Sequence, residues 1–170
     1  MKMYQSLSQI VFFSNKINHL KETIVVEEPE FLFWSMVNFL ARQNYKKWES
    51  CISSNSIIHP TAYVSNYNVK IGCRTIVEPN VVIHPDVEIG ENCIIRSGAV
   101  IELEGFEHKQ TKRGVVSIFH DGKVVIDDYV EIGGLNSIAK GFMGVDTIIK
   151  SQTKTDSLVH IAAVILESCV

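Results

Sequence analysis

The sequence lacks a strong excess of either charge, a long apolar run and any paired-cysteine motif. Its 170 residues carry a formal net charge of -3, which gives no indication of a nucleic-acid partner. No apolar run reaches the roughly 20 residues that a membrane-spanning helix needs, so we expect no membrane span. The first residues, MKMYQSLSQIVFFSNK, lack a continuous apolar core and a small-residue cleavage site, so we expect no signal peptide.

The four cysteines are too scattered to indicate a metal site or a disulfide framework. Cys51, Cys73, Cys93 and Cys169 contain no C-x-x-C pair. Free thiols in a reducing cytoplasm are the favoured interpretation, and we expect neither a metal nor a cofactor.

What the sequence does have is a repeat of six residues. From residue 71 it reads IGCRTI, VEPNVV, IHPDVE, IGENCI and IRSGAV. An aliphatic residue opens each unit, and a small or β-branched residue follows four positions later, as at Thr75 and Ala99. The opening residues are Ile71, Val77, Ile83, Ile89, Ile95 and Ile101. The pattern begins at Ile58 with one extra residue near Val64, and it returns at Ile126, Ile132, Ile149, Thr155 and Ile161.

A period of six fits neither an amphipathic helix nor an alternating strand. It fits short strands joined by tight turns, in which three units make one coil and stacked coils share a continuous core. Turn-forming residues occupy the remaining positions, among them Gly72, Gly90 and Gly98. The sequence therefore predicts an all-β parallel β-helix over residues 57–170.

Two segments fall outside the repeat. Residues 102–124 carry charge, glycine and two histidines, and we expect a functional loop excursion from the coil. Residues 1–56 are predicted to form a small α/β domain and linker, with a strand at residues 23–26. A helix is predicted to begin at Pro29, because proline suits the first helical turn. The helix is apolar nearly all round, which predicts that it is packed.

The combined layout resembles UDP-3-O-acylglucosamine N-acyltransferase, a lipid A pathway family of hexapeptide-repeat acyltransferases. The segments that carry the resemblance are FFSNKIN, IVVEEPEFLFWSMVNFL, IHPTAYV, EGFEHK and GKVVIDDYVEIGGLNSI. The resemblance implies a left-handed β-helix, a uridine-binding N-terminal domain and a cytoplasmic homotrimer. It also implies transfer of an acyl chain from acyl carrier protein, or from an acyl-CoA, to the amine of a UDP-linked glucosamine.

Site residues carried over from the family lie in two places. Phe12 would stack on the uracil ring and Asn15 would bond its edge, whereas the family's second uracil-stacking tyrosine is Asn18 here. Gly105 and Phe106 belong to the segment similar to the family's D-G-F-G-F loop and are candidate substrate-binding residues.

The family's catalytic base has no counterpart in this sequence. That base is the histidine of an I-A-H-N turn, whereas this chain reads VHIAAVILES, with Ala163 in place of the His-Asn pair. His160 is the one substitute that the sequence offers, against an ordinary exposed turn histidine. The family would continue through further coils to a helical tail, so a shortened C-terminus and an inactive chain are both expected.

Alternative functions remain open at this point. The same fold serves acetyl-CoA-dependent nucleotide-sugar acetyltransferases, and a non-catalytic trimeric scaffold fits the vacant base. A γ-class carbonic anhydrase is disfavoured, because the H-x-x-x-x-H spacing of its zinc site is absent. His108 and His120 in the excursion are further candidates for lining a substrate cleft, and His59 and His84 are interpreted as structural turn residues.

Overall fold

The computed structural model describes residues 12–14 and 23–167. Near the N-terminus, β1 (Phe12–Ser14) and β2 (Thr23–Val25) pair in parallel, and α1 (Pro29–Gln43) follows. The helix begins at its proline as predicted, with Glu30 in its first turn and Arg42 in its last. The acidic residue lies at the positive end of the helix dipole and the basic residue at the negative end, so both interactions stabilise the helix.

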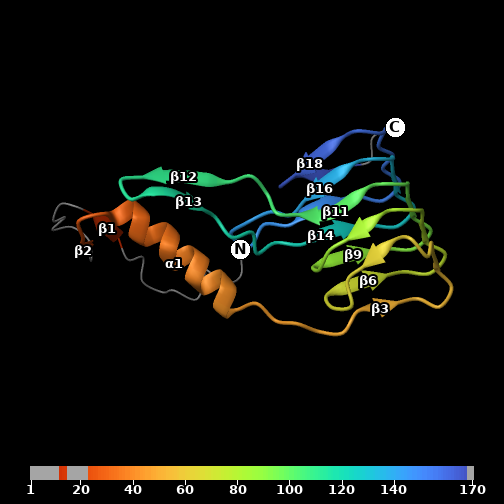
Figure 1. Ribbon diagram of the computed structural model, residues 1–170, viewed down its shortest axis with the longest axis horizontal. Helices are drawn as coiled ribbons and strands as arrows, with labels where there is room; N and C mark the ends of the chain where they lie inside the picture. The colour runs from red at the N-terminus through yellow and green to blue at the C-terminus, as the bar shows by residue number, and fades with distance from the viewer. Residues whose placement is uncertain (1–11, 15–22, 168–170) are drawn as a thin grey trace.

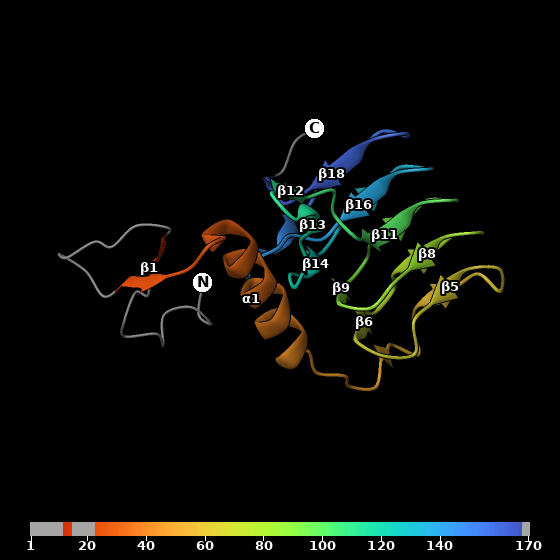
Figure 2. The ribbon, with the colours of Figure 1, turned by 60° about the vertical axis from the view of Figure 1, so that its left-hand side comes forward.

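The rest of the chain winds into a parallel β-helix with three sheets (Figures 1 and 2). The first sheet contains β3 (Cys51–Ile52), β6 (Val69–Ile71), β9 (Val87–Ile89), β14 (Val124–Ile126), β17 (Thr147–Ile149) and β19 (Ile165–Leu166). The second contains β4 (Ile57–Ile58), β7 (Ile76–Val77), β10 (Ile94–Ile95) and β15 (Glu131–Ile132). The third contains β5 (Tyr63–Val64), β8 (Val82–Ile83), β11 (Val100–Leu103), β16 (Ser137–Ala139) and β18 (His160–Ala162).

The predicted inward positions of the repeat form the core. All six opening residues from Ile71 to Ile101 are at most 2% exposed, and the small residues between them are fully buried. Each stacks on its counterpart one coil away, as in the register that pairs Ile71 with Ile89 and Ile89 with Ile126. The predicted parallel β-helix of hexapeptide repeats is therefore confirmed.

The turns repeat with the same period as the core. One residue in each six has a positive φ angle, in the run Asn68, Arg74, Asn80, Asp86, Asn92 and Gly98. Asparagine, aspartate and glycine reach this left-handed region at the lowest cost, which explains why they recur at these positions. Local turn chemistry and the inward aliphatic residues thus specify the same coil.

A hairpin leaves the coil after β11 and packs against α1. Its strands β12 (His108–Thr111) and β13 (Gly114–Ser117) are antiparallel, and the chain rejoins the coil at β14. Asn38 of α1 donates to the Ser117 carbonyl at 2.8 Å and accepts from the Phe119 backbone N–H at 2.7 Å. In Figures 1 and 2 the helix and hairpin lie side by side next to the solenoid.

The helix is less packed than its composition predicts. Val37 and Ala41 are buried, but Phe33, Met36 and Phe39 are 40–60% exposed. The predicted packing of the helix therefore holds for the face that carries Val37 and Ala41, and it fails for the exposed aromatic and methionine side chains. In the first sheet, β3 already pairs with β6 at Cys51, so the regular coils begin before residue 57.

Candidate functional site

The departures from the six-residue period fall at one corner of the β-helix. This is the turn that leads from the third sheet back to the first, and we call it the excursion corner. It is defined by Asn68, Asp86, Glu102, Lys140 and Ala163, one from each successive coil. The one-residue insertion near Val64, the hairpin and the 140–146 loop all lie there. A site built on such irregular segments is held in place by the regular coils beneath it.

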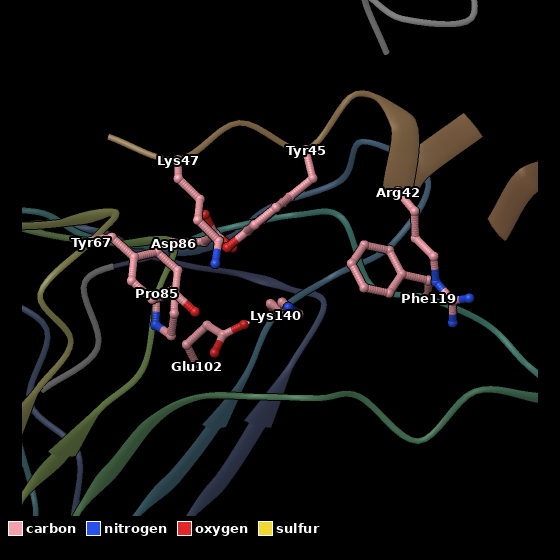
Figure 3. A pocket seen from close by; sticks show the side chains of 9 residues that line it. All are labelled: Arg42, Tyr45, Lys47, Tyr67, Pro85, Asp86, Glu102, Phe119 and Lys140. Atoms are coloured by element: carbon pink, nitrogen blue, oxygen red, sulfur yellow. Dashed lines mark ion pairs between the residues drawn. The ribbon is translucent and has the colours of Figure 1, made fainter. Parts of the chain in front are cut away.

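A pocket of about 480 Å³ opens beside this corner (Figure 3). It lies within the usual size range of small-molecule sites. Its wall is formed by the excursion corner, the end of α1, the segment after α1 and the segment that returns from the hairpin to the coil. The lining residues are Arg42, Tyr45, Lys47, Tyr67, Pro85, Asp86, Glu102, Phe119 and Lys140.

A buried ion pair forms part of the pocket wall. The Lys140 ammonium lies 2.6 Å from the Glu102 carboxylate, and both side chains are less than a tenth exposed. Burial raises the pKa of the Glu102 carboxyl to about 7, although the bond to Lys140 acts in the opposite direction. Burial lowers the pKa of the Lys140 ammonium, but the hydrogen bond and charge of Glu102 outweigh it and raise the pKa overall. Lys140 therefore stays charged at neutral pH, whereas the pH there lies close to the pKa of Glu102.

Backbone strain accompanies this pair. Glu102 has a φ angle of 70°, a region that a glutamate rarely adopts, and the pairing of β11 with β16 shifts register after Ile101. Strained residues of this kind persist where the surroundings fix them, and they concentrate at functional sites. Here the bond to Lys140 fixes the side chain of Glu102.

The second carboxylate of the pocket is also engaged. Asp86 accepts a hydrogen bond of 2.8 Å from the Asn68 side chain, and the Tyr45 hydroxyl bonds to it as well. Burial, followed by the charge of Asp86, raises the pKa of Tyr45, so the phenol keeps its proton. Asn68 is nearly fully buried and also bonds the backbone at Lys46 and Trp48, which ties the segment after α1 to the coil.

The candidate residues of the excursion do not line this pocket. A side chain at Gly105 would collide with the His120 imidazole, whose Nε2 atom is 2.1 Å from the position of a Cβ atom. His120 is buried, and its backbone N–H donates to Glu104 at 3.0 Å. Phe106 is 92% exposed and makes an edge contact with His108 at 4.5 Å between ring centroids. Gly105 is thus required for close packing, and Phe106 is free to contact a ligand.

The candidate base lies on an outer face of the coil, away from the pocket lining. The exposed His160 is paired in register with Ser137, and its Nδ1 atom lies 2.7 Å from the Ser137 hydroxyl oxygen. Ala163 occupies the next turn with a φ angle of 47°, and its N–H donates to the Thr147 hydroxyl at 3.0 Å. Leu166 follows Ile161 by five positions and pairs with Ile149, so this turn is one residue shorter than the repeat.

The two uridine-site candidates cannot be described at the level of side chains. The backbone of Phe12 belongs to β1, while its side chain and all of Asn15 and Asn18 lie outside the described residues. Within the described part of the chain, no cluster of three metal-binding side chains occurs, and Cys51, Cys73 and Cys93 are free thiols. No helix there is long and apolar enough to cross a membrane.

Sequence reasoning missed the charged residues of the pocket. Glu102 and Lys140 follow the inward residues Ile101 and Ile138 closely, at the two places where the next unit is delayed. The sequence did offer one signal for these two residues. Each is a charged residue that closely follows the last inward residue before the period is interrupted. Arg42 and Tyr45 carry no comparable signal, because their position depends on how α1 packs.

Comparisons with known proteins first define a class. The family described as bacterial transferase hexapeptide (six repeats) matches residues 68–102, which cover the most regular coils. These residues contain the inward positions and the left-handed turns described above. The chain thus carries the hexapeptide repeat of bacterial transferases.

Individual relatives match longer stretches of the chain than the repeat model does. UDP-3-O-acylglucosamine N-acyltransferase of Wolinella succinogenes is 43% identical over 88 residues, which are 51% of this chain and 27% of that protein. The enzyme of the same name from Polynucleobacter asymbioticus is 32% identical over 171 residues, covering 81% of this chain and 48% of that protein. The chain spans at most about half the length of these relatives. The predicted resemblance to UDP-3-O-acylglucosamine N-acyltransferases is confirmed.

One solved structure aligns with nearly the whole chain at low sequence identity. The acetyltransferase domain of PglB from Neisseria gonorrhoeae FA1090 is 14% identical, and the comparison covers 99% of this chain and 85% of that domain. The TM-score is 0.22.

Proposed function

We propose that the chain is an N-acyltransferase-type β-helix that binds a UDP-linked glucosamine derivative and an acyl donor. The donor would be acyl carrier protein or an acyl-CoA. Support comes from the hexapeptide coils, from the G-F segment at the excursion and from relatives named UDP-3-O-acylglucosamine N-acyltransferase. The same proposal includes the left-handed sense of the coil, a uridine-binding domain that precedes β3, a homotrimer and a cytoplasmic location.

The chemistry needs a base that this chain does not supply at the family position. The sugar amine attacks the thioester carbonyl, the C–S bond breaks, the thiolate leaves and a base takes the proton of the amine. A positioned base contributes roughly 10²–10⁴ in rate. The observation that carries this part is the shortened turn at Ala163, whose methyl group takes no proton.

We therefore propose that substrate binding is retained and that acyl transfer is negligible. His160 is the named substitute base, held by Ser137 at 2.7 Å on an open face. A non-catalytic trimeric scaffold is the second candidate, and the same vacant turn favours it. The acetyl-CoA-dependent acetyltransferase is the remaining alternative.

Nucleotide binding separates these candidates. Titration with UDP should show binding that Phe12→Ala weakens, because the uracil loses its stacking partner. The matched control is Tyr129→Ala, which removes an exposed aromatic residue from a different turn of the coil. Absence of UDP binding in the unmodified chain would favour the scaffold, and equal weakening by both variants would refute the role of Phe12.

A further inference from the structure

The charges around the 480 Å³ pocket do not balance. Its two carboxylates already have donors, since Glu102 bonds Lys140 and Asp86 bonds Asn68 and Tyr45. Two cations of the lining are left over, Arg42 and Lys47. Within residues 12–14 and 23–167, neither forms an ion pair with a carboxylate. Counted together, the lining carries three cations and two carboxylates, so the pocket has a net positive charge, and Arg42 and Lys47 are its two cations without an ion pair in that part of the chain.

Each of these two cations lies over an aromatic ring of the same pocket. The Lys47 ammonium is 4.3 Å from the centroid of Tyr67, and the Arg42 guanidinium is 5.5 Å from the centroid of Phe119. The Lys140 ammonium lies on Phe119 as well, also at 5.5 Å. Such contacts restrain long side chains that would otherwise be free. Both cations are thus pre-positioned at the pocket by rings that also line it (Figure 3).

We propose that this pocket binds a phosphate ester of a ring-bearing organic group. Arg42 and Lys47 hold the phosphate, and the rings of Phe119 and Tyr67 contact the organic part. Guanidinium matches phosphate with two parallel N–H donors, and the ammonium adds a compact charge. The buried Glu102–Lys140 pair forms the polar part of the wall behind the ligand. Phe12 and Asn15 are not among the described residues of this lining, and the proposal does not depend on acyl transfer.

The anionic group is assigned to the two unpaired cations rather than to Lys140. The charge of Lys140 is already matched by Glu102 at 2.6 Å, and Glu104 lies 3.4 Å away on its other side. A ligand that displaced Glu102 would leave a buried carboxylate without a donor, which is costly. Arg42 and Lys47 are exposed and bind an anion without breaking an existing pair.

Isothermal titration calorimetry with phenyl phosphate, inorganic phosphate and phenol tests the proposal on the unmodified chain. Phenyl phosphate should bind about tenfold more tightly than inorganic phosphate, because ring contact adds to the charge interaction. Phenol alone should bind more weakly than either. Binding should weaken as salt is raised, since both cations are exposed.

Single variants test which residues contact the phosphate and which contact the ring. Arg42→Gln and Lys47→Gln should each weaken binding of phenyl phosphate about tenfold, the loss typical of one charge-assisted hydrogen bond. The matched control, Lys112→Gln, removes an exposed lysine from the turn of the hairpin and should leave binding unchanged. Phe119→Leu should remove the advantage of phenyl phosphate over inorganic phosphate.

Three outcomes would overturn the proposal. They are no binding of phenyl phosphate at millimolar concentration, equal weakening by Lys112→Gln and Lys47→Gln, and equal affinity for phenyl phosphate and inorganic phosphate. The last result would reduce the pocket to a nonselective anion site. Because UDP titration of Phe12→Ala is read separately, failure here leaves the proposed function untouched.

Discussion

Replacing Lys140 by methionine tests the energetics of the buried pair. The substitution keeps a long flexible side chain and removes the charge that lies 2.6 Å from Glu102. Glu102, itself 6% exposed, then has no ammonium beside it and avoids burying an unpaired charge by keeping its proton. Its folded-state pKa therefore rises above the value of about 7 that it has beside Lys140.

The magnitude follows from proton linkage. When folding raises the pKa of a carboxyl, the free energy of unfolding falls as pH rises above the unfolded pKa near 4.5. The fall ends once the carboxyl ionises in the folded protein as well. In the unmodified chain this loss stops at about pH 7, where Glu102 ionises. In Lys140→Met the loss continues at about 1.4 kcal/mol per pH unit. The extra loss of unfolding free energy in the variant should therefore grow by about 3 kcal/mol between pH 7 and pH 9.

Urea unfolding followed by circular dichroism at several pH values measures this difference. The double variant with Glu102→Gln and Lys140→Met should show no such growth, because no carboxyl remains to titrate. Lys150→Met, which removes a half-exposed lysine, is the matched single-site control. A destabilisation by Lys140→Met that is constant from pH 6 to pH 9 would refute the reasoning.

Three further predictions concern the coil and its corner. Ile89→Asp should abolish folding, seen as loss of the β-type circular dichroism spectrum, because it buries an unpaired charge at a position that is 2% exposed. Asn68→Ala should lower the free energy of unfolding by about 2 kcal/mol in urea, because it removes buried hydrogen bonds. Alanine also fits the φ angle of 57° less well than asparagine. The control Asn66→Ala, at an exposed neighbouring position, should leave the stability unchanged. Iodoacetamide should label the exposed Cys51 well before Cys93, whose thiol pKa is raised by burial, and labelling of Cys93 in the folded chain would contradict the burial.

The regular part of the fold was predictable because every six-residue unit needs an inward aliphatic residue and a turn-forming residue at the same positions. Ile71 and Ile83 each pair with an isoleucine in the following coil, so one pattern predicts the core, the turns and the parallel pairing. The excursion was predictable as an interruption, because the period visibly stops after Ile101.

The pocket was not predictable by the same argument. Arg42 and Tyr45 reach it only because Asn38 fixes α1 against the hairpin, and Asn68 fixes the following segment against the coil. Those contacts join residues far apart in the sequence, so the six-residue repeat gives no information about them. The pairing of Glu102 with Lys140 likewise requires the stacking of two interrupted coils.

The most direct test of the proposed function is an acyl-transfer assay. It uses an acyl carrier protein donor and a UDP-linked acylglucosamine acceptor, and it compares the unmodified chain with a variant in which Ala163 is replaced by the pair His-Asn. His160→Ala is measured alongside, since its imidazole bonds Ser137 and is the other candidate base. We predict UDP binding without turnover in the unmodified chain, and turnover only in the variant that carries the His-Asn pair. Robust turnover by the unmodified chain that His160→Ala abolishes would contradict the account.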